Sequence, residues 1–207
     1  MAETRDSKEM KKRQREAALN NLNGNISRLA SVYLVEQSNF GEKVSDAVER
    51  VIYHPAISLG MGFIDPESGQ EGNALTLGKN GLIASRIDGK RYTGSINEMQ
   101  ILENAAGIMQ DSLKYLTVED VFGLMGAESS VYEKVKRNLA QYIGKGRDVK
   151  DLYVSDLPEE QMKQVIGGYQ GFLAYKAVSE ATGTIAKQTP GQLEKILSGE
   201  ETPRQAA

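Results

Sequence analysis

The stretch IGGYQGFLAYKAVSEATG, Ile166 to Gly183, constrains the fold of this chain most, because three of its first six residues are glycine. The stretch lies within an apolar pattern typical of a helix over residues 157–182. Each glycine costs about 1 kcal/mol relative to alanine inside a helix, so the helix needs a closely packed neighbour to compensate for that cost. Small or medium side chains recur there at spacings of 4, 3, 4 and 3, which predicts one shared face of interface candidates: Gly167, Gly171, Ala174, Val178 and Ala181.

Three interpretations of this face stay open. It is a groove for another helix of the same chain, an interface between subunits, or a segment broken at Gly167-Gly168 into two shorter helices. A membrane span is not expected, because the window 165–186 contains Lys176 and Glu180, and ionisable residues inside a span are costly. A dinucleotide-binding loop is not expected either, since no strand precedes the glycines.

The N-terminal third predicts a charged arm followed by two helices. Residues 1–16 form the arm. Apolar residues then recur at helical spacing from Leu19 to Tyr33, with Gly24 and Asn25 weakening the middle of that helix. A second helix is expected over Glu42–Tyr53, ended by Pro55 because proline disfavours helical geometry in the preceding residue. Residues 54–73 are rich in glycine and proline and are expected to form a loop.

In the central segment the helical spacing of apolar residues gives way to short runs compatible with β-strands. Short β-compatible runs near 74–78, 82–87 and 90–93 alternate with glycine-containing turns, which predicts an antiparallel β-meander over 74–93. Helical patterns return after it, and Thr117 with the acidic residues Glu119 and Asp120 opens a short helix. The predicted class is α+β and predominantly α-helical: a helical bundle with one small meander, a single domain over 17–198, and a frayed tail at 199–207.

The amino-acid composition excludes several kinds of site. The chain of 207 residues has no cysteine and one histidine, so disulfides, thiolate zinc sites and histidine-rich metal sites are excluded. We expect no metal and no cofactor. The first residues lack the apolar core of a signal peptide, and we expect a cytoplasmic protein. A formal net charge of -3 argues against nucleic-acid binding over the whole surface but leaves a local basic patch possible.

Candidate catalytic residues are few. His54 has a reference pKa near neutrality, but its place between a helix end and Pro55 favours a structural role at that terminus. The carboxylates of Asp65, Glu67 and Glu71 lie in an acidic loop whose spacing departs from that of a calcium loop at Gly69 and Thr76. A carboxylate- or metal-dependent enzyme remains an alternative, although the balance leans against an enzyme.

Two basic clusters, over residues 79–91 and 134–150, offer a second class of function. Basic side chains gathered on one face can bind phosphate groups of nucleic acid. The leading hypothesis is a non-enzymatic interaction or assembly subunit that binds a protein partner or itself through helix faces. The alternative is a nucleic-acid-associated accessory protein that uses these residues: Lys79, Arg86, Lys90, Arg91, Lys134, Lys136, Arg137, Lys145, Arg147 and Lys150.

Overall fold

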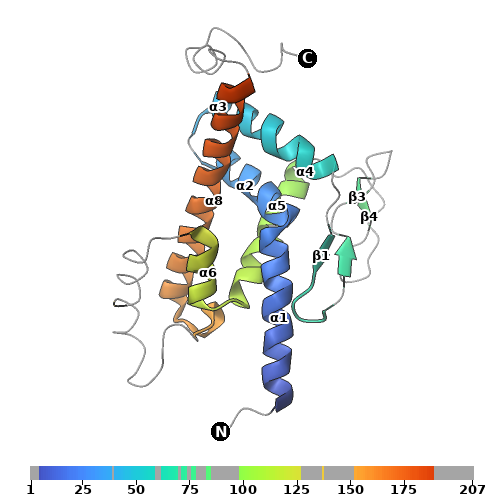
Figure 1. Ribbon diagram of the computed structural model, residues 1–207, viewed down its shortest axis with the longest axis vertical. Coiled ribbons are helices and arrows are strands. Elements are labelled where there is room, and N and C mark those ends of the chain that lie inside the picture. The colour runs from blue at the N-terminus through green and yellow to red at the C-terminus, as the bar shows by residue number, and fades with distance from the viewer. Residues whose placement is uncertain are drawn as a thin grey trace.

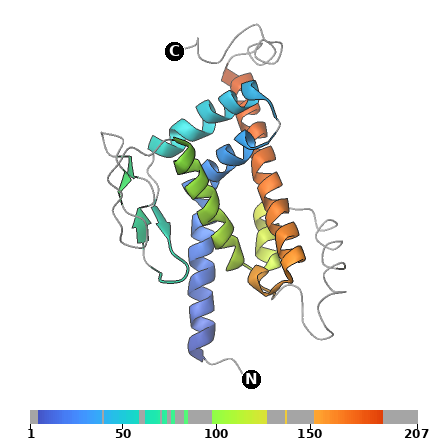
Figure 2. The ribbon, with the colours of Figure 1, turned by 180° about the vertical axis from the view of Figure 1, so that it is seen from behind.

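The computed structural model describes residues 5–38, 40–58, 62–69, 71–73, 76–77, 83–84, 98–126, 137 and 152–188. Within these ranges the protein is predominantly helical, as predicted. Figures 1 and 2 show the longest helices running roughly along one long axis, with the short strands on one flank. The elements in chain order are α1 Arg5–Asn23, α2 Asn25–Glu36, α3 Glu42–Val48, a π-helix Glu49–Tyr53, α4 His54–Ser58, β1 Gly62–Ile64, β2 Glu71–Asn73, β3 Thr76–Leu77, β4 Ile83–Ala84, α5 Glu98–Lys114, α6 Val118–Met125, a 3-10 helix Val154–Asp156 and α8 Glu159–Gln188.

Helix α2 lies at the centre of the packing, because it contacts α1, α3, α5 and α8. Its apolar residues are buried on more than one side, as a central helix requires. The core divides into two clusters along the long axis. The lower cluster joins α1, the start of α2, α5, α6 and the first half of α8, and includes Leu22, Ile26, Met109, Val121 and Tyr169. The upper cluster joins the rest of α2 to α3, the start of α5 and the second half of α8, and includes Leu29, Val48, Ile101, Ala177 and Ala181.

Helices α1 and α2 are separated by one residue, Gly24. Its backbone is extended (φ -98°, ψ -164°), and its N–H donates to the Asn21 carbonyl at 3.3 Å. A Cβ at this position would come within 3.2 Å of the Asn20 carbonyl oxygen, so a side chain would crowd the end of α1. The weakness predicted at Gly24 is therefore a break between two helices.

The second predicted helix, Glu42–Tyr53, continues past Pro55 to Ser58, so the expectation that Pro55 ends it is wrong. The His54 N–H donates to the Glu49 carbonyl, which makes the preceding turn a π-helix. Pro55 is the second residue of α4, a position in the first turn where an α-helix needs no N–H donor. The wide turn thus restarts the helix at a place that tolerates proline.

Residues 62–73, predicted as part of a loop, contain the β1–β2 hairpin. Its strands pair antiparallel, with Phe63 opposite Gly72. The Asp65 carboxylate accepts from the N–H groups of Glu67 and Ser68 at 3.1 and 3.2 Å, and Gly69 adopts the left-handed φ of +68° that closes the turn. The acidic loop is therefore a turn in which Asp65 binds the backbone.

A buried amide on α1 holds this hairpin in place. Asn21 is 3% exposed, and its Nδ2 donates to the Ile64 carbonyl at 2.7 Å while its Oδ1 accepts from the Ile64 N–H at 2.8 Å. Nδ2 also donates to the Ser112 hydroxyl on α5 at 3.1 Å. The Asn21 side chain thus hydrogen-bonds both the N–H and the carbonyl of Ile64, as a neighbouring strand would on that edge.

The predicted β-meander over 74–93 is not supported. In that segment the structure describes two strands of two residues each, in which Thr76 pairs with Ala84 and Leu77 with Ile83. The third expected strand, at 90–93, lies outside the described residues. The hairpin that contributes Phe63 to the lower cluster lies upstream of the predicted meander.

The chain from α5 to α8 builds the other side of the lower cluster. Segments 116–118 and 152–154 pair antiparallel, with Val118 N–H donating to the Leu152 carbonyl at 2.9 Å and Val154 N–H to the Leu116 carbonyl at 2.8 Å. Helix α6 ends at Gly126, whose left-handed φ of +59° is typical of a helix C-terminus. Helix α8 follows Pro158 without a break to Gln188, so the interpretation that it splits at Gly167-Gly168 is wrong.

Candidate functional site

The glycines of α8 face away from the body of the protein. Gly167, Gly168 and Gly171 are exposed, and a Cβ built on any of them would meet no atom within 4 Å outside the local helix. These glycines receive no neighbouring helix from the described residues. The closely packed neighbour that we expected to offset the low helix propensity of these glycines is therefore absent from the described part of the chain.

The predicted interface candidates divide into two groups. Ala174 and Ala181 are 4% and 0% exposed and belong to the upper cluster, where α8 packs against α2 and α3. Val178 is half-buried at the edge of that cluster, whereas Gly167 and Gly171 are exposed. The intramolecular groove thus accounts for the alanines, and no described residue packs on the glycines.

A large aromatic side chain lies beside the exposed glycines. Tyr175 is 69% exposed, the largest value among the exposed large hydrophobic side chains of the described residues. It lies four residues after Gly171 and eight after Gly167, so the three share one side of the helix. No charged residue occurs between Gln164 and Tyr175. We call the surface formed by Gly167, Gly168, Gly171 and Tyr175 the glycine face.

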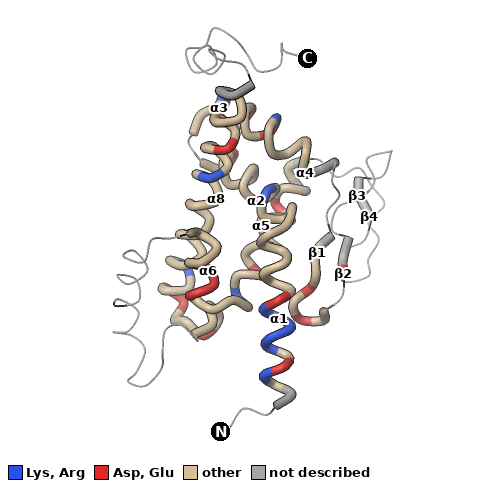
Figure 3. The backbone as a smooth tube through the Cα atoms, in the orientation of Figure 1, with Lys and Arg blue, Asp and Glu red and all other residues tan. Residues whose placement is uncertain are grey.

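The charged segment predicted as an arm is helical from Arg5 onward and continues into the rest of α1 without a break at residue 16. Figure 3 shows that the charges of α1 gather in its first half. Two basic residues there contact the body: Lys11 Nζ lies 5.4 Å from the centre of the Tyr153 ring, and Arg15 binds Asp120. The limits of the arm, the domain and the tail remain predictions.

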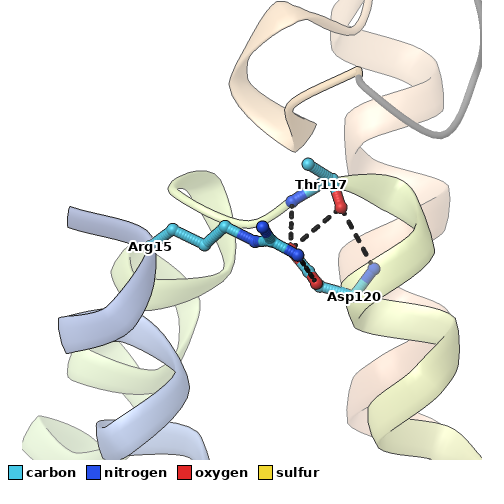
Figure 4. A network of polar contacts seen from close by, with 3 residues as sticks. All are labelled: Arg15, Thr117 and Asp120. Atoms are coloured by element: carbon cyan, nitrogen blue, oxygen red, sulfur yellow. Dashed lines mark hydrogen bonds and ion pairs between the residues drawn. The ribbon is translucent and has the colours of Figure 1, made fainter. Parts of the chain in front are cut away.

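Arg15, Asp120 and Thr117 form the best-connected polar network among the described residues (Figure 4). The Nε and Nη2 groups of Arg15 each donate to the Asp120 carboxylate at 2.6 Å. Asp120 also accepts from the Thr117 N–H at 3.0 Å, and the Asp120 N–H donates to the Thr117 hydroxyl at 3.2 Å. Thr117 and Asp120 thus form a capping box at the start of α6, which confirms the predicted helix start there.

The network shifts the pKa values of Asp120 and Arg15. Burial works to raise the pKa of Asp120, but hydrogen bonds from Arg15 and Thr117 outweigh it and hold the pKa below the ordinary value. The hydrogen bond to Asp120 raises the pKa of Arg15. Both groups therefore stay charged, and a charge pair fixed at a helix cap favours a structural role over proton transfer.

Among the described residues, the catalytic candidates predicted from the sequence form no metal-binding group. His54 is exposed, and its ring meets the edge of Tyr53 at 5.5 Å between centroids. The described part of the chain contains no group of three or more histidine, aspartate or glutamate side chains able to hold a metal ion. The Asp65 carboxylate is engaged by its own turn.

The basic clusters lie almost wholly outside the described residues. Arg137 is described and is exposed, and the other nine candidates fall outside. Nucleic-acid binding therefore stays a prediction. No helix among the described residues has the length and apolar character that crossing a membrane requires.

Comparisons with protein-family models, curated proteins and solved structures found no match to this chain. Its function is therefore argued from its own residues.

Proposed function

We propose that this protein is a non-enzymatic interaction or assembly subunit that binds a partner helix on the glycine face of α8. The observation that carries the proposal is the exposure of Gly167, Gly168 and Gly171 in the middle of a 30-residue helix. Three interior glycines cost about 3 kcal/mol of helix stability relative to alanine. A partner helix that approaches the bare backbone closely would recover part of that cost through dispersion contacts.

Tyr175 supports the same proposal. A tyrosine exposed to this extent supplies apolar area with a polar end, a combination enriched at protein interfaces. The face is also uncharged along its centre, so a partner helix would desolvate no ionised group there.

A second copy of the chain is the first partner to test. If two α8 helices crossed antiparallel about Gly171, positions four residues on either side would face each other. Tyr175 of each helix would then lie against Gly167 of the other, a large side chain over a bare backbone. The face is self-complementary in this arrangement, as a two-fold symmetric interface requires.

Sedimentation velocity over a concentration series tests the proposal with Gly171→Leu and the matched control Gly183→Leu. Both glycines are exposed and have no neighbour within 4 Å, but Gly183 lies outside the glycine face. Both substitutions raise helix propensity, and only Gly171→Leu should abolish association. If the partner is another protein, affinity capture from the native host should lose it with Gly171→Leu alone. Association that survives this substitution, or a wild-type chain that binds nothing, overturns the proposal.

The lack of cysteine offers a direct test of the symmetric arrangement. Gly171→Cys introduces the single thiol of the chain at the proposed two-fold axis. Mild oxidation should give a disulfide-linked dimer for this variant and none for Gly183→Cys. An equal yield from both variants would show random collision and would rule out the crossing about Gly171.

A further inference from the structure

A cleft of about 250 Å³ lies between α2 and α8, on the side of α8 away from the glycine face. Its floor is apolar and includes Leu22, Ile52 and Leu173. Its wall carries polar and basic groups from both helices. We call this space the α2–α8 cleft, and its volume lies just below the usual range for small-molecule sites.

Ser27 is the first sign that the cleft receives a ligand. The residue lines the cleft and is 7% exposed, yet its Oγ has no hydrogen-bond partner among the described residues. Burial raises the pKa of the neighbouring Tyr169 phenol, and Ser27 lowers that pKa by a smaller amount. The two hydroxyls nevertheless do not meet in hydrogen-bond geometry. A buried hydroxyl without a partner is destabilising, and a ligand oxygen would remove that cost.

The start of α2 is the second sign. Gly24, at the N-cap, offers no side chain to the first-turn N–H groups, and no acidic residue occurs in that turn. The first turn of a helix has N–H groups without intrahelical acceptors and carries a partial positive charge. Asn23, Gly24 and Ser27 all line the cleft. The positive end of a 12-residue helix thus borders the same space as the unpartnered hydroxyl.

The charged side chains around the cleft are the third sign. Arg28 and Lys176 line it, and one carboxylate, Glu180, faces these two cations. Arg28 Nη2 donates to Glu180 at 3.0 Å, but its Nε, also buried, has no hydrogen-bond partner among the described residues. Lys176 Nζ lies 5.9 Å from the centre of the Phe172 ring. The described side chains that line the cleft therefore leave one positive charge uncompensated.

We propose that the α2–α8 cleft binds a small phosphate monoester, with its phosphate at the start of α2 and its apolar body against the floor. Ser27, Arg28 Nε and Lys176 supply donors for the phosphate oxygens, together with the N–H groups of Ile26 and Ser27 in the first turn of α2. Helix starts with basic side chains beside them are established phosphate sites in proteins. This inference is independent of the interaction proposed for the glycine face.

Phenyl phosphate is the probe, with phenol and inorganic phosphate as its two halves. Isothermal titration calorimetry should show phenyl phosphate binding more tightly than either half. Ser27→Ala should weaken its affinity about tenfold to a hundredfold, the effect of one lost hydrogen bond to a charged group. Lys176→Met should weaken it similarly and reduce its dependence on salt. Lys163→Met, which changes an exposed lysine of the same helix outside the cleft, should leave the affinity unchanged.

Amide chemical shifts give an independent readout of position. Phenyl phosphate should shift the N–H resonances of Ile26 and Ser27 in the wild-type protein. Absence of binding, binding unaffected by both Ser27→Ala and Lys176→Met, or phenol binding as tightly as phenyl phosphate would each overturn the proposal. The last result would show an apolar cleft with no preference for an anion.

Discussion

Replacing Asp120 with alanine removes a charge pair and a helix cap at once. Loss of the capping box at the start of α6 costs about 1 kcal/mol. The Arg15 side chain is 45% exposed and that of Asp120 11% exposed, so solvent screens the pair and we assign it about 1 kcal/mol despite its two-point geometry. The expected loss is therefore about 2 kcal/mol in the free energy of unfolding. For a chain of this length it lowers the melting temperature by about 4–8 °C.

Thermal and urea unfolding followed by circular dichroism measure this loss. Glu119→Ala is the matched control, because it removes an exposed carboxylate from the same helix turn and should cost only a few tenths of a kcal/mol. A double-mutant cycle with Arg15→Ala should give a coupling energy of about 1 kcal/mol. Equal losses for Asp120→Ala and Glu119→Ala, or a coupling energy near zero, would refute the idea that the network fastens α1 to α6.

The same network predicts a dependence on pH. The pKa of Asp120 is lower in the folded protein than its ordinary value of 3.8, so its contribution to stability is present above that value. The contribution is lost as pH falls through the folded pKa, because the folded carboxylate must then take up a proton. The stability difference between the wild type and Asp120→Ala should shrink in acid and stay constant near neutrality.

Three further predictions concern other parts of the fold. Gly167→Ala should raise the free energy of unfolding of the separate chain by about 1 kcal/mol, measured by urea unfolding at low protein concentration; a loss would show that something packs on that position. Asn21→Ala should lower it by about 2–4 kcal/mol, because both backbone groups of Ile64 lose their partner, and should speed hydrogen exchange of the Ile64 amide; unchanged exchange would contradict this role. Burial and the nearby Glu67 carboxylate raise the pKa of Tyr115 to about 12, so its contribution to stability is present below pH 10.0 and falls as pH rises toward 12. Tyrosinate absorbance should show a lower pKa for Tyr115 in Glu67→Gln, and an unchanged value would exclude the carboxylate as a cause.

Features fixed by neighbouring residues were predictable from the sequence. The cap at Thr117 depends on side chains within one turn, and the structure forms it as a capping box with Asp120. The long helix around the glycines follows from an apolar pattern repeated over many residues, and α8 confirms it with slightly later bounds. Gly24 interrupts the first helical pattern where its low helix propensity predicts a weak point.

Features fixed by distant parts of the chain were not predictable in this way. The pairing of Arg15 with Asp120 joins residues 105 positions apart, and no local pattern marks either of them as a partner. The β1–β2 hairpin depends on a single amide from α1 as well as on its own turn. At Pro55 the sequence predicts a helix end, but the helix continues through a π-helical turn into α4.

The residues of α8 that were predicted to share one face lie in two different environments, for a geometric reason. In the first half of the helix Val165, Tyr169 and Leu173 are buried against the lower cluster. From Ala174 onward the buried side changes to Ala174, Ala177 and Ala181, against α2 and α3. The buried stripe therefore rotates around the helix at its middle. A series of residues at regular helical spacing is therefore exposed to solvent before that point and buried in the core after it.

The central place of α2 has a consequence for synthesis of the chain. Arg28 on α2 binds Glu180, a residue 152 positions later, and α2 also packs against α5 and α8. On the ribosome, α1 and α2 emerge long before these neighbours exist, so their apolar sides stay uncovered while most of the chain is made. Closure by such distant contacts is slow, and exposed apolar surface promotes aggregation during that interval. The earliest helices to be translated are thus the ones that most need protection from aggregation until α8 is complete.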